Sequence, residues 1–270
     1  MSYEKKVSRV QPALIVIILD DSGSMEDPLP GTTDAKYQWV ERLTGVIFKE
    51  LLARSTELKG DTAQIKSRYF VYVITYGSNP EVWGAGEMDI KAAVEKYAND
   101  GNSLALGGKL GGTDAAAAFK KAYEYLKEAV TDQRFRKSFP PMVFHLTDGM
   151  SATDASPIAE QIKQLSTEDG NVLVVNAYIG TQTSLSYKGT EDFPGYVDLS
   201  DVGSDEDNVR LFNMSSEVPM CVRQNLIDDG IFPNVKEGAR LFFDVRTKDM
   251  LKHTIQVVGS MGSRADRNVR

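Results

Sequence analysis

The chain has 270 residues, of which 41% are hydrophobic and 26% charged, and its formal net charge is −7. A chain of this length can bury a large core without covalent staples, and its single cysteine excludes an internal disulfide framework. With only two histidines, a Cys/His zinc site is excluded as well, and the acidic balance argues against nucleic acid as a partner.

The N-terminus superficially resembles a signal peptide, because basic residues precede the apolar run 13–19. This run has only seven residues and ends in Asp20-Asp21, without a small-residue cleavage pattern. A buried strand explains it better. No other run approaches the roughly 20 apolar residues that a membrane span needs. We therefore expect a cytoplasmic protein that does not bind a membrane.

In the first half of the chain, apolar runs alternate with amphipathic stretches. The run Ala13–Leu19 predicts a strand buried on both faces, and a helix is expected over residues 35–53. Arg68–Tyr76, rich in β-branched and aromatic residues, predicts a second strand. A short helix over Ile90–Tyr97 and an alanine-rich helix over Asp114–Val130 follow. The first helix should bury one stripe, formed by Trp39, Val40, Leu43, Val46, Ile47 and Leu51.

The second half continues the alternation. Met142–Thr147 and Val172–Ile179 predict buried strands, and between them Ser156-Pro157 resembles an N-cap followed by proline, which opens a helix to about Leu165. Residues 180–205, rich in Thr, Ser, Gly and Asp, are expected to form a long surface excursion. The last expected elements are a short helix near Asp207–Asn213, a strand over Leu241–Val245 and a helix over Lys248–Val258.

Strands of doubly buried composition, separated by helices, predict the α/β class with an open, mostly parallel central sheet and helices on both faces. The excursion at 180–205 is the one candidate boundary, and the segment after it is too short for an independent domain. We therefore expect a single domain over residues 1–270. Its core should span about 11–258, with a mobile arm at 1–10 and a mobile tail at 259–270.

Short side chains with oxygen donors lie near the ends of three of these elements. Asp20, Ser22 and Ser24 come directly after the first strand, Thr113 precedes the alanine-rich helix, and Asp148 follows the strand at 142–147. Ligands of an open α/β sheet bind at the carboxyl ends of its strands, so these loops should meet at one edge. Carboxylate and hydroxyl oxygens are hard donors that suit Mg²⁺, with Mn²⁺ or Ca²⁺ as alternatives.

Each feature alone also has a purely structural explanation. Ser24 or Asp27 could cap a turn, Thr113 could be an ordinary helix N-cap, and Asp148-Gly149 is a common turn dipeptide. The combination of three such loops at one sheet edge favours a metal site over these separate explanations.

The same residues match a known pattern. The sequence resembles a von Willebrand factor A (VWA) domain with an intact metal-ion-dependent adhesion site, whose motif falls on Asp20, Ser22, Ser24, Thr113 and Asp148. The resemblance covers about residues 11–258. It implies a Rossmann-like fold that holds one cation, usually Mg²⁺, and a partner protein whose carboxylate completes the coordination. Two carboxylates and three neutral hydroxyls carry little charge for a dication that takes six oxygens, which gives such a carboxylate a physical reason to bind.

A narrower resemblance is to bacterial VWA proteins of tellurite-resistance-type stress gene clusters. It rests on Asp21-Ser-Gly-Ser-Met25 and on Leu211–Pro219. Such proteins are often encoded beside a protein kinase and a phosphatase, which become candidate partners. Asp27 also resembles the acid that builds a second metal site in integrin β subunits, but Pro28 replaces a further acid of that site.

Three functions remain open. The first is a metal-dependent protein-binding module without enzymatic activity, in a stress-response or signalling system. The second is a subunit of a multiprotein machine that docks to an AAA+ ATPase through the same site. The third is a metal-dependent hydrolase, for which Glu26 or Asp114 would have to serve as the base. In the resembled family the last helix moves together with the metal loops, so Lys248–Val258 is a candidate switch.

Other chemistries lack their residues. Ser22 occupies the position of the second acid of a haloacid-dehalogenase-type phosphatase, and no Gly-x-Ser-x-Gly nucleophile elbow exists. His145 lies mid-strand and is expected to pack in the core. His253 is expected at the surface, and Cys221 is interpreted as a buried small residue.

Overall fold

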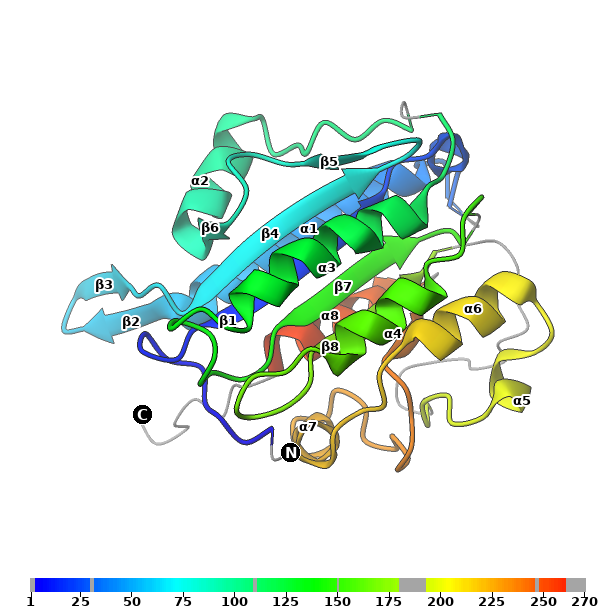
Figure 1. Cartoon of the computed structure of the whole chain (residues 1–270). Helices are drawn as coiled ribbons and strands as arrows, with labels where there is room; N and C mark the ends of the chain where they lie inside the picture. Colours follow the sequence, from blue (N-terminus) through cyan, green and yellow to red (C-terminus); the bar gives the residue numbers. More distant parts are fainter. Residues whose placement is uncertain are drawn as a thin grey trace.

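The computed structural model describes residues 3–29, 32–108, 111–149, 151–179, 193–245 and 248–260 (Figure 1). The strands in this part of the chain are β1 (Ala13–Asp20), β2 (Thr56–Lys59), β3 (Thr62–Ile65), β4 (Tyr69–Tyr76), β5 (Pro80–Val82), β6 (Met88–Asp89), β7 (Met142–Thr147), β8 (Leu173–Tyr178) and β9 (Phe242–Asp244). Its helices are the 3-10 helix η1 (Gly23–Glu26) and α1 (Lys36–Ser55), α2 (Ile90–Asn99), α3 (Ala115–Ala129), α4 (Ser156–Gln164), α5 (Leu199–Val202), α6 (Glu206–Met214), α7 (Met220–Asp228) and α8 (Lys248–Ser260).

One central sheet organises the molecule, with the strand order β5-β4-β1-β7-β8-β9 and with β6 as a further partner of β4. β1, β4, β7, β8 and β9 run parallel, whereas β5 and β6 are antiparallel to β4. This arrangement confirms the predicted α/β class. The chain passes from β1 to β4 on one side and then to β7 on the other side of β1, so the strand order reverses beside β1. Ligands of open α/β sheets bind at such a reversal.

Helices cover both faces of this sheet (Figure 1). On one face α1 packs against α2 and α8, and on the other α4 packs against α3 and α6. The strands between these layers are mostly apolar, and every residue of β1, β7 and β8 is buried. Burial on both faces explains why these strands stand out in the sequence as continuous apolar runs.

Helix α1 presents its apolar stripe to the interior, with one difference from the expected set. Val46 is 49% exposed, whereas Phe48, which the expected stripe omitted, is fully buried. Phe48 packs edge-on against Tyr97 of α2. Gly45 lies so close to the same ring that an added Cβ would be 2.7 Å from the Tyr97 hydroxyl. The close contact with α2 therefore sets which side of α1 is buried.

Two further elements carry little sequence signal. The β2–β3 hairpin exposes most of its residues, including Leu58, so it lacks the alternation of buried and exposed side chains that predicts a strand. Helix α7 buries only Val222 and Leu226, which leaves its amphipathic pattern weak.

The surface excursion expected at 180–205 is wrong for residues 193–196, whereas residues 198–200 are exposed as expected. Residues 180–192 lie outside the described residues, but Phe193 and Tyr196 are almost completely buried, and α5 follows them. Phe193 packs edge-on against Tyr196 and at a tilt against Phe232. Two aromatic side chains in a polar stretch are enough to attach this segment to the core.

Residues 3–5, which belong to the arm expected at 1–10, are attached to the connection between α4 and β8. The N–H of Tyr3 donates to Asp169 O, and the N–H groups of Glu4 and Lys5 donate to the Asp169 carboxylate, each at 3.0 Å. At the other end of the chain, residues 261–270 of the expected tail lie outside the described residues.

Helix α8 closes the described chain and packs against α1, α7 and β9. Of its expected apolar stripe, Met250, Ile255 and Val258 are buried, and the side chain of Leu251 lies outside the described part. Among the described residues, no helix combines the length and the apolar character that crossing a membrane requires.

Candidate metal site

Three loops meet at the carboxyl ends of β1 and β7. The loop after β1 is joined to the loop before α3 by a 3.2 Å hydrogen bond from the N–H of Gly23 to Gly111 O. The loop after β7 is joined to the same loop by a 2.9 Å hydrogen bond from the N–H of Ala152 to Thr113 O. The predicted site residues lie on these loops or at the end of β1: Asp20, Ser22, Ser24, Thr113 and Asp148. The fold thus places all five at one edge of the sheet.

Asp20 is the last residue of β1 and is completely buried. Its Oδ1 accepts a 2.9 Å hydrogen bond from the N–H of Ser22, and its Oδ2 accepts a 2.7 Å hydrogen bond from the Thr147 hydroxyl. Burial raises the pKa of Asp20 to about 6, and the negative charge of Asp148 adds to this effect. The two carboxylates therefore repel each other, which a cation bound to both would relieve.

The serine hydroxyls lie beside these carboxylates. The Oγ atoms of Ser22 and Ser24 are 3.2 Å apart, with Ser22 buried and Ser24 half-buried. Ser22 is the N-cap residue of η1, yet its side chain makes no capping hydrogen bond. The Ser22 hydroxyl instead bonds to the Asp20 carboxylate, so it lies next to a candidate metal ligand.

Asp114, and not Thr113, caps helix α3. Its Oδ1 accepts hydrogen bonds from the N–H of Ala117 at 2.9 Å and from the Thr153 hydroxyl at 2.8 Å. The structural explanation of Thr113 as the N-cap is therefore wrong. The same bonds hold the Asp114 carboxylate in a structural role, which weakens it as a hydrolytic base. Glu26, the other candidate base, lies exposed in η1.

Asp148 has a buried oxygen without a partner among the residues that the structure describes. Its side chain is 1% exposed, and its Oδ2 accepts a 3.0 Å hydrogen bond from the Lys36 ammonium. Its Oδ1 is buried and has no hydrogen-bond partner among the described residues. An unpaired buried carboxylate oxygen costs free energy, and native proteins rarely leave one. A cation bound by this oxygen would satisfy it, so the residues present fit a divalent ion.

This site differs in composition from a dedicated acidic cage. No group of three or more His, Cys, Asp and Glu side chains placed to hold a metal occurs within the described ranges. The candidate ligands are instead two carboxylates and three hydroxyls, which are the hard oxygen donors that Mg²⁺ accepts together with water.

Lys36 is a close neighbour of these residues that sequence reasoning missed. It is the first residue of α1, its side chain is only 4% exposed, and its ammonium contacts both Asp148 Oδ2 and, at 3.1 Å, Ser24 O. A lysine at the first position of a helix opposes the helix dipole, which is the one local signal that could have drawn attention to it.

A buried polar chain runs from Asp20 across the sheet. The Tyr76 hydroxyl lies 3.3 Å from Asp20 Oδ2 and 2.8 Å from His145 Nε2. On the other side of the ring, His145 Nδ1 lies 2.8 Å from Asn176 Oδ1. Burial lowers the pKa of His145 to about 4, against the opposing effect of the Asn176 hydrogen bond, so the ring is neutral near pH 7.

The far end of this chain fixes the direction of its hydrogen bonds. The Asn176 side-chain amide donates to Leu211 O at 3.2 Å and to Ser215 Oγ at 2.9 Å, which leaves its Oδ1 as the acceptor toward His145. His145 therefore carries its proton on Nδ1, and its Nε2 and Asp20 Oδ2 both face the single proton of the Tyr76 hydroxyl. The expected core role of His145 includes holding the Tyr76 hydroxyl next to Asp20.

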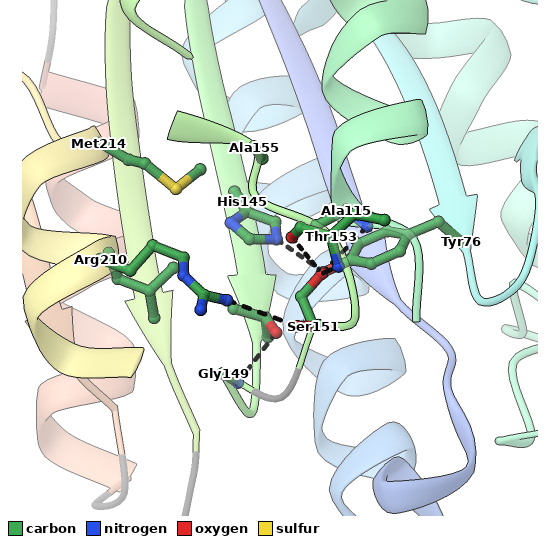
Figure 2. A pocket seen from close by; sticks show the side chains of 11 residues that line it. Tyr76, Ala115, His145, Gly149, Ser151, Thr153, Ala155, Arg210 and Met214 are labelled. Carbon is green, nitrogen blue, oxygen red and sulfur yellow. Dashed lines mark hydrogen bonds between the residues drawn. The ribbon is translucent and has the colours of Figure 1, made fainter. Parts of the chain in front are cut away.

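A small cavity lies beside this chain (Figure 2). It has a volume of about 10 Å³, enough for one water molecule. Tyr76 and His145 line it from the sheet, Ser151 from the loop after β7, and Arg210 from α6, with the guanidinium directed toward the Ser151 backbone. This cavity is too small to admit a substrate.

Cys221 and His253 are not part of the site. Cys221 is half-buried rather than fully buried, and its thiol donates to Tyr3 O at 2.9 Å. His253 is half-buried and packs at a tilt against Phe232.

No protein-family model matches the chain, and no curated protein matches its sequence. Solved structures resemble its fold. An aerotolerance-related membrane protein from Bacteroides fragilis matches with a TM-score of 0.50 and 14% identity, over 92% of this chain and 100% of that protein. BatB from Bacteroides thetaiotaomicron matches with a TM-score of 0.46 and 15% identity, over 92% and 98%. The VWA domain of SpRpn10 matches with a TM-score of 0.43 and 14% identity, over 64% and 78%. At these identities the likeness concerns the fold alone.

Proposed function

We propose that this chain is a protein-binding module that recognises its partner through one divalent cation, Mg²⁺ in the first instance. The observation that carries the proposal is the buried Oδ1 of Asp148, which has no hydrogen-bond partner in the described part of the chain and lies at a sheet edge with a second buried carboxylate, Asp20. Ser22, Ser24 and Thr113 would provide the neutral oxygens of the same ion. The resemblance of these five residues to a metal-ion-dependent adhesion site supports the assignment.

The charges at the site favour an anionic partner group. Asp20, Asp148 and the buried ammonium of Lys36 together carry one net negative charge when both acids are ionised. A bound dication offsets this negative charge and supplies a positive centre that attracts a carboxylate. Recognition by an acidic side chain of a partner protein then needs no catalytic base, and the engaged carboxylate of Asp114 agrees with binding rather than hydrolysis.

A stress-response or signalling system, with a kinase or a phosphatase as the partner, is the narrower form of this proposal. Its support is the resemblance of Asp21–Met25 and Leu211–Pro219 to tellurite-resistance-type proteins. The second stretch also has a structural task, because Ser216 exchanges hydrogen bonds with Val174 of β8 through its N–H and its hydroxyl. The narrower proposal therefore rests mainly on the first stretch.

Titration calorimetry with MgCl₂ and MnCl₂ tests the metal assignment. We expect binding to the wild-type protein and a weakening of roughly tenfold or more in Asp20→Ala and in Asp148→Ala, because each removes one of only two charged ligands. Asp154→Ala is the matched control. This exposed aspartate lies on the loop after β7, and its carboxylate accepts a hydrogen bond from the N–H of Ser156 at the start of α4. Equal affinity in the wild type and both site variants would refute the assignment.

A further inference from the structure

The ammonium of Lys36 is held among acidic groups. Its Nζ lies 3.0 Å from Asp148 Oδ2, 3.1 Å from Ser24 O and 3.9 Å from Asp27 Oδ2. We propose that Lys36 is a tethered cation that pairs with Asp148 in the metal-free protein and moves to Asp27 when a divalent cation binds. This inference rests on the proposed function, because it names the residue that sets the metal affinity of the same site.

Lys36 occupies a position that disfavours a lysine without a specific partner. The N-terminus of a helix carries partial positive charge that repels a cation, and removing an ammonium from water costs free energy. Asp148 supplies the compensation, because the two paired side chains are 4% and 1% exposed. The lysine in turn neutralises a carboxylate that would otherwise be buried next to Asp20 without any cation.

A divalent cation would compete with this ammonium for the same carboxylate. Two positive charges a few Å apart repel each other strongly where water is excluded. The metal and Lys36 are therefore alternatives at Asp148, and the lysine needs a second acceptor if it is to leave.

Asp27 provides that acceptor. Its carboxylate is 69% exposed, so an ammonium that turns toward it regains contact with water. The N–H of Lys36 donates to Asp27 O at 3.0 Å, which keeps the two residues next to each other. The lysine side chain can therefore exchange between the two acids by rotation of its own bonds, while the backbone of α1 stays in place.

The test measures Mg²⁺ affinity by calorimetry and thermal stability in EDTA for the wild type and Lys36→Met. We expect Lys36→Met to bind Mg²⁺ on the order of tenfold more tightly, because the competing charge is gone. In EDTA the same variant should melt at a lower temperature, because Asp148 then lacks a cation, and saturating Mg²⁺ should reduce this difference. Lys49→Met, an exposed lysine of the same helix, is the matched control.

Asp27→Asn tests whether Lys36 pairs with Asp27 when the metal is bound, and this variant removes no buried group. We expect it to weaken Mg²⁺ binding several-fold where Lys36 is present and to have no effect in the Lys36→Met background. Asp34→Asn, which changes a half-buried acid of the same segment that pairs with Arg42, controls for the general loss of negative charge.

The outcomes separate this inference from the proposed function. Wild-type binding with equal affinities, within twofold, in Lys36→Met and Asp27→Asn would overturn the inference and leave the metal site intact. Binding by Lys36→Met alone would support the competition at Asp148 and contradict the metal-dependent function of the native protein. The absence of Mg²⁺ binding in both proteins would overturn both proposals.

Discussion

The hydroxyl oxygen of Tyr76, at the end of β4, lies 2.8 Å from Nε2 of His145, in the middle of β7. Both side chains are buried, and the same hydroxyl lies 3.3 Å from Asp20 Oδ2. Through this contact the polar chain inside the sheet reaches one of the two carboxylates of the candidate metal site. Tyr76 is thus a positioning residue for Asp20.

Tyr76→Phe should destabilise the protein by about 1–3 kcal/mol, because it removes the hydroxyl that faces two buried acceptors, Nε2 of His145 and Oδ2 of Asp20. Urea unfolding in EDTA measures this change. Tyr123→Phe, on the half-buried side of α3, is the control and should change the free energy of unfolding by less than about 0.5 kcal/mol. Equal stability of Tyr76→Phe and the wild type would show that neither contact of this hydroxyl stabilises the fold.

The pKa of Asp20 predicts a pH dependence of the metal-free protein. Because this pKa is about 6 in the folded chain and 3.8 in the reference state, the folded protein binds the proton more tightly. The contribution of Asp20 to stability is therefore complete below about pH 4 and is lost as the pH rises through 6. Between these limits the free energy of unfolding of the wild type should fall by on the order of 3 kcal/mol relative to that of Asp20→Asn, whose side chain cannot ionise.

The comparison with Asp20→Asn is needed because His145 acts in the opposite direction. Its pKa is about 4 in the folded chain and 6.5 in the reference state, so its contribution is lost as the pH falls from about 6.5 to 4. Both proteins share this effect, and it cancels in the difference between their urea unfolding free energies. If the difference in unfolding free energy between the wild type and Asp20→Asn did not change between pH 4 and 7, the raised pKa of the buried Asp20 would be wrong.

Gly45→Ala should destabilise the protein although alanine favours helices. The new Cβ would lie 2.7 to 2.9 Å from three atoms of the Tyr97 side chain, which must move and disturb the contact between α1 and α2. Overpacking of this kind costs about 1–3 kcal/mol. Thermal unfolding of Gly45→Ala measures this cost, with Lys49→Ala, a change at an exposed position of the same helix, as the control. An unchanged or raised melting temperature would show that α2 does not approach α1 this closely.

Glu41 should hold the loop that leads toward Thr113. Its Oε1 accepts hydrogen bonds from the Ser103 hydroxyl at 2.7 Å and from the N–H groups of Leu104 and Leu106 at 3.0 Å. Glu41→Ala should therefore accelerate hydrogen exchange at the amides of Leu104 and Leu106 by tenfold or more, the equivalent of about 1.4 kcal/mol. Glu41→Gln keeps an acceptor oxygen and should give a smaller effect. Exchange unaffected by Glu41→Ala would refute this role.

The sequence alone predicted the sheet strands well because their signal is simple. β1, β7 and β8 are buried on both faces, so each appears as a continuous apolar run. The rule that loops gather at the carboxyl ends of parallel strands then placed Asp20 and Asp148 at one edge, where the structure also has them.

The contacts around these carboxylates depend on distant residues and could not be predicted in the same way. Lys36 meets Asp148 from 112 positions away, and the bond between Tyr76 and His145 spans 69. The position of Lys36 at the start of a helix is its one local signal, and no local pattern singles out Tyr76. Phe193 and Tyr196 show the same limit, because the polar composition around them predicts a surface loop while their rings fill the core.

Crystals of the wild-type protein grown with Mn²⁺ test the central claim most directly, through the anomalous signal of the ion. We predict one strong peak within about 2.3 Å of Ser22 and Ser24 oxygens, on the side of Asp148 that carries Oδ1. The Lys36 ammonium should then contact Asp27. An empty edge of the sheet at a saturating Mn²⁺ concentration, or a peak only at other residues, would contradict the account.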